Sequence, residues 1–123
     1  MPDIDEITKT LEVYFDALYE GDLKKIRAVF HPASHLYSAT DGNFVDIPLE
    51  EYVSLVSGRP SPKAQSVPRS GAVVLIDQSG PNSALAKVTL SIGNRNFTDY
   101  LTLLRIGGEW KIIAKAYHFI ESK

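Results

Sequence analysis

In the first half of the chain, apolar residues recur at intervals of three and four, the period of an amphipathic helix. The pattern predicts a first helix whose buried face comprises Ile7, Leu11, Tyr14, Phe15 and Leu18. Asp3 followed by Glu6 resembles a capping box at its start, and Gly21 is a suitable stop.

Two shorter helices are predicted next. Asp22 caps the first of them, and Pro32 ends it because proline disfavours helical geometry at the residue before it. The other begins near Pro48 and ends at Gly58. The apolar faces of these two helices comprise Leu23, Ile26 and Phe30, and Leu49, Tyr52, Val53 and Val56, respectively.

The remaining periodic segments alternate with the two-residue period of strands. They predict strands at 34–39, 43–47, 72–77, 84–92, 97–106 and 109–120. Residues 57–71 contain three prolines, four serines and two glycines and are typical of a long loop. Helices followed by a long meander favour an α+β fold, with the helices packed on one face of a curved, mostly antiparallel sheet.

Composition narrows the class of protein. A chain of 123 residues suits one domain spanning 1–123. A net charge of -2, with the basic residues scattered, gives no reason to expect nucleic acid or an anionic membrane as a partner. Cysteine is absent, which removes disulfides and thiolate chemistry. With no apolar leader or membrane-length segment in the sequence, we expect a cytoplasmic protein.

A carboxylate interrupts the apolar stretch FTDYLTLL at 97–104. On a strand, Asp99 shares a face with Phe97, Leu101 and Leu103, where an ionised acid is costly unless something compensates it. Asp99 therefore either lines a polar cavity, where desolvation raises the pKa of a carboxyl group, or serves as a structural hydrogen-bonding group.

The chain resembles the nuclear transport factor 2-like superfamily in its order of elements and in three motifs: FHP at 30–32, DYLTLL at 99–104 and GEWKIIAK at 108–115. The closing hairpin is similar to that of its SnoaL-related, putative lumazine-binding branch. The resemblance implies a cystatin-like fold with a conical pocket between sheet and helices, and commonly a homodimer through the outer sheet face. It does not imply one function, because this fold carries enzymes, transport factors and binding proteins.

Strand parity independently predicts a semi-apolar outer face, which favours a homodimer. The residues assigned to that face are Thr98, Tyr100, Thr102, Leu104, Ile113, Tyr117 and Phe119.

Several polar side chains are candidates for chemistry. Tyr14 is either an oxyanion donor or a core tyrosine with a satisfied hydroxyl. His118 shares strand parity with Trp110 and is either a general base in the pocket or a strand-end histidine. The ligand-binding candidates are Tyr14, Phe15, Tyr37, Tyr52, Asp99, Trp110 and His118; Asp99, His118 and Tyr14 are also the catalytic candidates.

A metal site is not expected, because Pro32 breaks the helical spacing between His31 and His35. No cofactor is expected either. Three cations of the long loop, Arg59, Lys63 and Arg69, either meet an anionic ligand at the pocket mouth or are simply solvated.

These features favour a small-molecule-binding protein with an apolar pocket, whose ligand is a small apolar or aromatic molecule. One alternative is a cofactor-free isomerase, dehydratase or cyclase using Asp99 or His118 as acid-base and Tyr14 to stabilise charge. Another is an interaction dimer whose pocket is filled by its own side chains.

Overall fold

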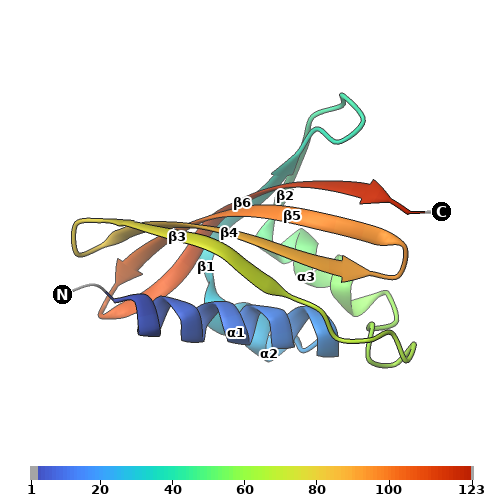
Figure 1. Ribbon diagram of the computed structural model, residues 1–123, viewed down its shortest axis with the longest axis horizontal. Coiled ribbons are helices and arrows are strands. Elements are labelled where there is room, and N and C mark those ends of the chain that lie inside the picture. The colour runs from blue at the N-terminus through green and yellow to red at the C-terminus, as the bar shows by residue number, and fades with distance from the viewer. Residues whose placement is uncertain (1–2, 123) are drawn as a thin grey trace.

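A computed structural model describes residues 3–122 as three helices on one face of a six-stranded sheet (Figure 1). This confirms the predicted α+β architecture. In chain order the elements are α1 (Ile4–Glu20), α2 (Leu23–Val29), β1 (Phe30–Ser38), β2 (Val45–Pro48), α3 (Leu49–Ser57), β3 (Ala72–Ser79), β4 (Ser83–Ile92), β5 (Arg95–Ile106) and β6 (Glu109–Glu121).

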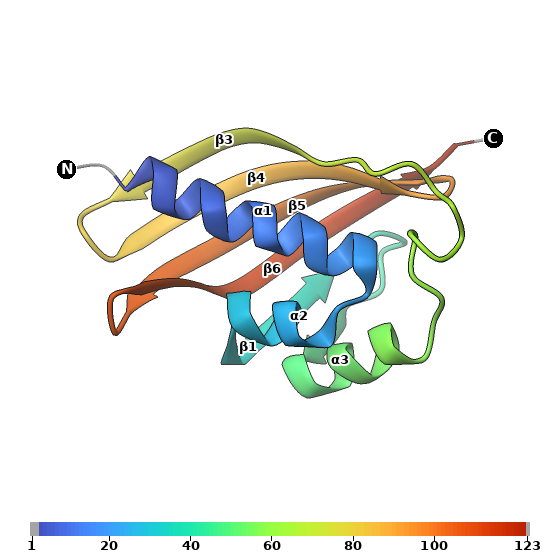
Figure 2. The ribbon, with the colours of Figure 1, turned by 90° about the horizontal axis from the view of Figure 1, so that it is seen from below.

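The strands lie in the order β2-β1-β6-β5-β4-β3. Only β1 and β6, among the pairs described, run parallel; the other neighbours are antiparallel. Figure 2 shows α1 crossing the sheet under β3, β4 and β5, while α2 and α3 lie beside β1. The helices therefore cover one face of the sheet, and no described helix covers the other face.

The core lies between α1 and the inner sheet face. Ile7, Leu11 and Tyr14 of α1 have no exposed surface, and neither do Leu101 and Leu103 of β5. Each fully buried aliphatic side chain contributes about 1.5–3 kcal/mol of transfer free energy. The predicted stripe of the first helix is thus its buried face.

The helix boundaries follow local signals in part. The Asp22 carboxylate accepts hydrogen bonds from the backbone N–H groups of Lys24 and Lys25, and Gly21 ends α1 with a left-handed φ of 65°. The predicted helix reaching Phe30 is wrong, because α2 ends at Val29 and β1 starts with Phe30. That start pairs Phe30 with β6 and still buries its ring.

The capping box at the first helix is also wrong. Asp3 is the N-cap residue but its side chain accepts no capping hydrogen bond. Instead its carboxylate accepts from Gln78 Nε2 at 3.1 Å and lies 3.6 Å from Arg105 Nη1. The Asp3 carboxylate therefore contacts Gln78 and Arg105 on the sheet instead of a backbone N–H of the helix.

A β-bulge in β6 changes which of its side chains face the helices. Thr102 of β5 pairs with Ala114, and the next residue, Leu103, pairs with Ile112, so Ile113 has no partner in the register. One extra residue reverses the alternation beyond it. Before the bulge Ile112 faces inward; after it Lys115 does.

The assignment of Tyr117 and Phe119 to the outer face is therefore wrong. Both line the cavity described below. The outer face does expose apolar side chains from four strands: Leu75, Leu85, Tyr100 and Ile120.

Candidate functional site

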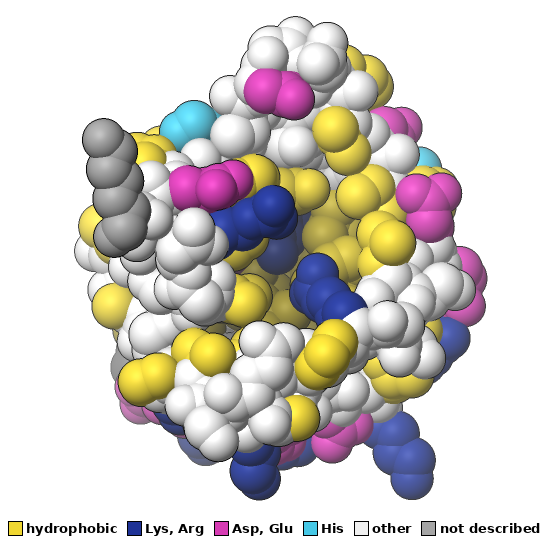
Figure 3. Space-filling view, turned by 90° about the vertical axis from the view of Figure 1, so that its right-hand side faces the viewer, with side chains coloured by type: hydrophobic (Ala, Val, Ile, Leu, Met, Phe, Trp, Pro, Cys, Tyr) yellow, Lys and Arg dark blue, Asp and Glu magenta, His cyan; other side chains and the backbone are white. Residues whose placement is uncertain are grey.

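A cavity of about 300 Å³ opens between the inner sheet face, the end of α1 and the loop that follows α3. Figure 3 shows it as a hollow with hydrophobic walls and Lys and Arg side chains at its rim and in its interior. Arg59, Pro60, Pro62 and Gln65 of the long loop form one wall. The apolar lining consists of Leu18, Leu36, Leu90, Ile92, Phe97 and Phe119, with Tyr52 and Tyr117 beside them.

A polar cluster lies at the inner end of the cavity, formed by Tyr14, Asp99 and Lys115. Asp99 is fully buried, and the Tyr14 hydroxyl donates a hydrogen bond of 2.6 Å to its Oδ2. Lys115 is 6% exposed, and its Nζ lies 3.7 Å from the same oxygen. Three elements meet here, because α1 supplies the tyrosine, β5 the carboxylate and β6 the ammonium group.

The Lys115 ammonium group is surrounded by aromatic rings. Its Nζ lies 5.3 Å from the ring centroids of Tyr14 and Tyr117 and 5.5 Å from that of Tyr52. Such cation–π contacts favour the charged form in a desolvated site. Burial is the largest single effect and lowers the pKa of Lys115, but the nearby Asp99, Tyr52 and Tyr117 together outweigh it, and the net pKa is raised. Lys115 is thus a charged donor at neutral pH, not a free amine.

The Tyr14 hydroxyl stays protonated in the same surroundings. Burial raises the pKa of Tyr14 well above its usual value, and the nearby Asp99 charge raises it further. Tyr14 therefore acts as a hydrogen-bond donor that fixes one oxygen of Asp99.

The second oxygen of Asp99 has no partner. Oδ1 is buried and accepts no hydrogen bond from any described residue. Asp99 is among the residues that line the cavity, and Oδ1 itself is buried. A buried carboxylate oxygen without a donor is costly and uncommon in native structures. A ligand that reaches this oxygen would supply the missing hydrogen-bond donor.

The predicted site residues divide into two groups. Asp99 and Tyr52 line the cavity, and Tyr14 contacts Asp99 directly. Phe15 is buried and packs against the Tyr14 ring, 5.8 Å away, but is not among the lining residues. The structure thus brings the predicted tyrosine and carboxylate together.

Two other predicted residues, Tyr37 and Trp110, lie outside the cavity. Tyr37 stacks between His35 and Phe44 near the β1–β2 connection, with centroids at 5.9 and 6.1 Å. Trp110 is buried beside a separate depression that includes residues of α1 and α2. Neither lines the cavity, so their placement there is wrong.

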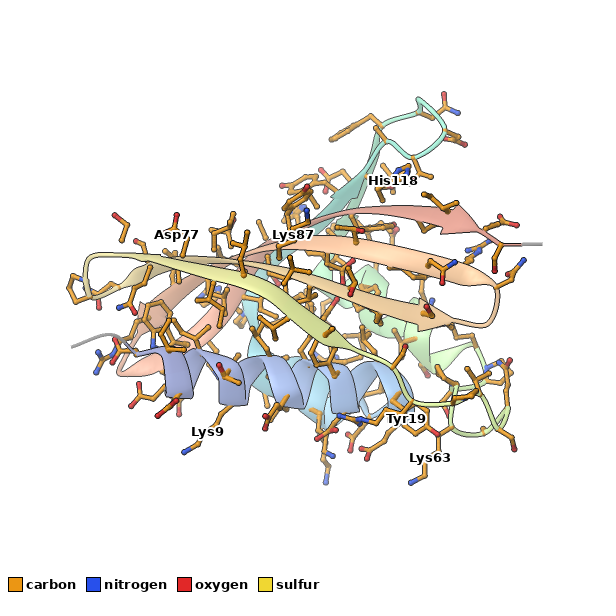
Figure 4. All side chains as sticks on the ribbon, in the orientation of Figure 1. Lys9, Tyr19, Lys63, Asp77, Lys87 and His118 are labelled. Carbon is orange, nitrogen blue, oxygen red and sulfur yellow. The ribbon has the colours of Figure 1, made fainter. Side chains whose placement is uncertain are left out.

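The placement of His118 in the pocket is wrong as well. The His118 side chain is exposed. Figure 4 shows His118 and Lys87 on the side of the sheet away from the helices. The cause is the bulge at Ile113, which reverses the parity on which the prediction depended. His118 is therefore not the base of this cavity.

The sequence reasoning missed Lys115, together with Arg95, Tyr117 and Phe119. The available signal was a lysine within the apolar segment IIAKAY, which is unusual for a strand whose neighbours are buried. Parity counted without the bulge places Lys115 on the face opposite Trp110, away from the cavity.

Metal-ligating side chains do not gather within residues 3–122 in any group of three or more. His35 Nδ1 instead lies 2.6 Å from Asp46, and His31 Nδ1 accepts from the Ala33 N–H. In the same described range, no helix has the length and apolarity needed to cross a membrane.

Known proteins resemble the chain over almost its full length. An NTF2-like protein of unknown function from Methylobacillus flagellatus has a TM-score of 0.81 and 26% identity, covering 96% of this chain and 92% of that one. A cystatin-like fold protein from Burkholderia xenovorans has a TM-score of 0.71 and 19% identity, with coverage of 100% and 96%. These likenesses support the NTF2-like fold.

One curated relative has a named activity. The protein named aldolase FrzH, from a Cladobotryum species, is 24% identical over 116 residues, covering 93% of this chain and 89% of the relative. The family described as putative lumazine-binding matches residues 2–118, nearly the whole chain. The chain therefore belongs to the putative lumazine-binding family of the NTF2-like superfamily.

Proposed function

We propose that this protein binds a small, largely apolar organic molecule in the cavity, oriented by a hydrogen bond to Asp99. The observation that carries the proposal is that Asp99, a residue of the cavity lining, has a buried oxygen, Oδ1, with no donor among the described residues. Aromatic and aliphatic walls suit the body of such a ligand, and one fixed polar group suits its orientation. The family description agrees with a ligand that is flat and heterocyclic.

The proposal is tested with N-phenylnaphthylamine (NPN), a neutral apolar fluorophore that carries one N–H donor. We expect saturable binding at one molecule per chain. Replacing Ile92, which lines the cavity, with tryptophan fills part of that space and should abolish binding. The matched control is Ile106→Trp at the end of β5, where the side chain is 43% exposed and does not line the cavity. Equal binding by wild type and Ile92→Trp contradicts the proposal.

An enzymatic role is the second candidate, favoured by the same orphaned oxygen and by the relative named an aldolase. In the cleavage direction, Asp99 Oδ1 would take the proton of the substrate's β-hydroxyl group as the Cα–Cβ bond breaks, giving an aldehyde and an enolate, and would return that proton to the α-carbon to form the ketone. The Lys115 ammonium group would then stabilise that enolate. Tyr14 would hold the carboxylate in position through Oδ2.

This second role is tested with a fluorogenic naphthyl β-hydroxy ketone that releases an aldehyde on retro-aldol cleavage. We expect slow turnover that is lost in Asp99→Asn. NPN affinity in the same variant should fall only severalfold, since the cavity walls remain. A rate unchanged in Asp99→Asn excludes Asp99 as the base.

We also propose that two copies associate through the outer sheet face. The exposed side chains of Leu75, Leu85, Tyr100 and Ile120 support this, because apolar groups on the face without helices would lose contact with water against a second copy. Light scattering should give twice the chain mass, and Tyr100→Glu should halve it. A monomeric wild type would contradict this proposal without affecting the cavity.

A further inference from the structure

The lining of the cavity carries more positive than negative charge. Arg59, Arg95 and Lys115 contribute cations, and Asp99 is the one carboxylate among the lining residues that the structure describes. An ionised Asp99 balances Lys115, which lies 3.7 Å away. No other carboxylate among the described lining residues balances the two guanidinium groups.

These two arginines have weak partners or none. Arg95 Nε lies 3.9 Å from Glu121 Oε1, and both side chains are about half exposed. The Arg95 guanidinium also lies over the Phe119 ring, 4.6 Å from its centroid, which holds it against the cavity wall. Within residues 3–122, Arg59 forms no ion pair with a carboxylate. Its charge acts on the interior, since it lowers the pKa of Lys115.

The other cations of the long loop provide a contrast. Arg69 pairs with Asp16 of α1 and lies over the Tyr19 ring, so its charge is already compensated. Lys63 is exposed and points away from the sheet (Figure 4). Of the three loop cations considered from the sequence, only Arg59 is among the lining residues. Its position is therefore not a general property of a basic loop.

We infer that the ligand of this cavity is an organic anion, whose apolar body lies between the aromatic and aliphatic walls and whose acid group pairs with Arg59 and Arg95 at the mouth. A guanidinium group binds carboxylates and related acid groups through two parallel N–H donors. This inference rests on the proposed ligand-binding function and adds the charge of the ligand to it. The donor group that meets Asp99 Oδ1 would lie at the opposite, inner end of the same molecule.

The test compares two fluorophores with the same aromatic skeleton. Anilinonaphthalene sulfonate (ANS) carries one acid group, and NPN lacks it. We expect Arg59→Gln and Arg95→Gln each to raise the dissociation constant of ANS by about three- to tenfold, the effect of losing one partly solvated charge-assisted contact. Their effect on NPN should remain within about twofold. Lys63→Gln, with the same change of charge on the same loop, should alter neither dye.

Salt and cavity controls separate the possible failures. Because the arginines are partly exposed, added salt should weaken ANS binding and leave NPN binding unchanged. Loss of both dyes in Ile92→Trp assigns them to the cavity. If NPN binds there but ANS is insensitive to both arginine substitutions, the anion inference is overturned and the binding function stands. If neither dye binds the wild type in a way that Ile92→Trp abolishes, the proposed function itself fails.

Discussion

Replacing Asp99 with leucine removes the carboxylate that faces the Lys115 ammonium group and leaves the Tyr14 hydroxyl without its acceptor. A buried charge that loses its partner costs about 3–5 kcal/mol. The cavity admits some water to Lys115, so the lower end of that range, about 3 kcal/mol, is the working value. For a domain of this size the loss corresponds to a fall of about 12 °C in Tm.

The assay is equilibrium unfolding in urea, with a cycle of variants. Lys115→Met in the Asp99→Leu background removes the stranded charge and should restore most of the lost free energy, to within about 1 kcal/mol of wild type. Asp77→Leu provides a matched control, because Asp77 is exposed on the outer face and the change should stay within about 0.5 kcal/mol. Figure 4 shows both Asp77 and Lys87 on that face.

An Asp99→Leu variant as stable as wild type, or more stable, would show that Lys115 and Tyr14 do not depend on the Asp99 carboxylate. It would mean that Asp99 faces an unused hollow and that Lys115 is hydrated without it. Failure of Lys115→Met to rescue the variant would locate the loss in Tyr14 or in packing instead.

Three further outcomes are expected. Because the folded-state pKa values of Tyr14 and Lys115 are raised, their stabilising contribution is complete below about pH 10 and is lost as pH rises through those values. When the free energy of unfolding is measured as a function of pH, Tyr14→Phe should therefore show a smaller decrease in alkali than wild type. Gly71→Ala should cost about 1–3 kcal/mol in urea unfolding, because Gly71 has φ 149° and a Cβ would lie 2.8 Å from the Phe15 ring; a silent change would show that the loop yields. His118→Ala should leave NPN binding, measured by fluorescence titration, and stability, measured by urea unfolding, unchanged. Loss of NPN binding would show that His118 belongs to the ligand site.

The fold was predictable because its elements are long and periodic. The stripe containing Ile7, Leu11 and Tyr14 is buried as its spacing indicates, and parity within β5 correctly turned Asp99 toward the helices. Both inferences need only the geometry of one uninterrupted element. They sufficed to bring Tyr14 and Asp99 to the same region.

The rest of the site depended on a register that the sequence does not mark. No glycine or proline accompanies the bulge at Ile113, yet it reverses every side chain beyond it in β6. Lys115 and Phe119 therefore line the cavity, whereas His118 lies on the outer face. Asp3 shows the same limit at the first helix, where Gln78 and Arg105 on the sheet outcompete the local cap.

The central claim is that the cavity takes a ligand against Asp99. It is tested most directly by a crystal structure of the protein with saturating ANS, at a resolution that orders single waters. We expect aromatic density between the apolar walls, the sulfonate beside Arg59 and Arg95, and a ligand N–H or bridging water about 3 Å from Asp99 Oδ1. A hollow closed by the protein's own side chains, with Oδ1 hydrogen-bonded to one of them, would contradict it.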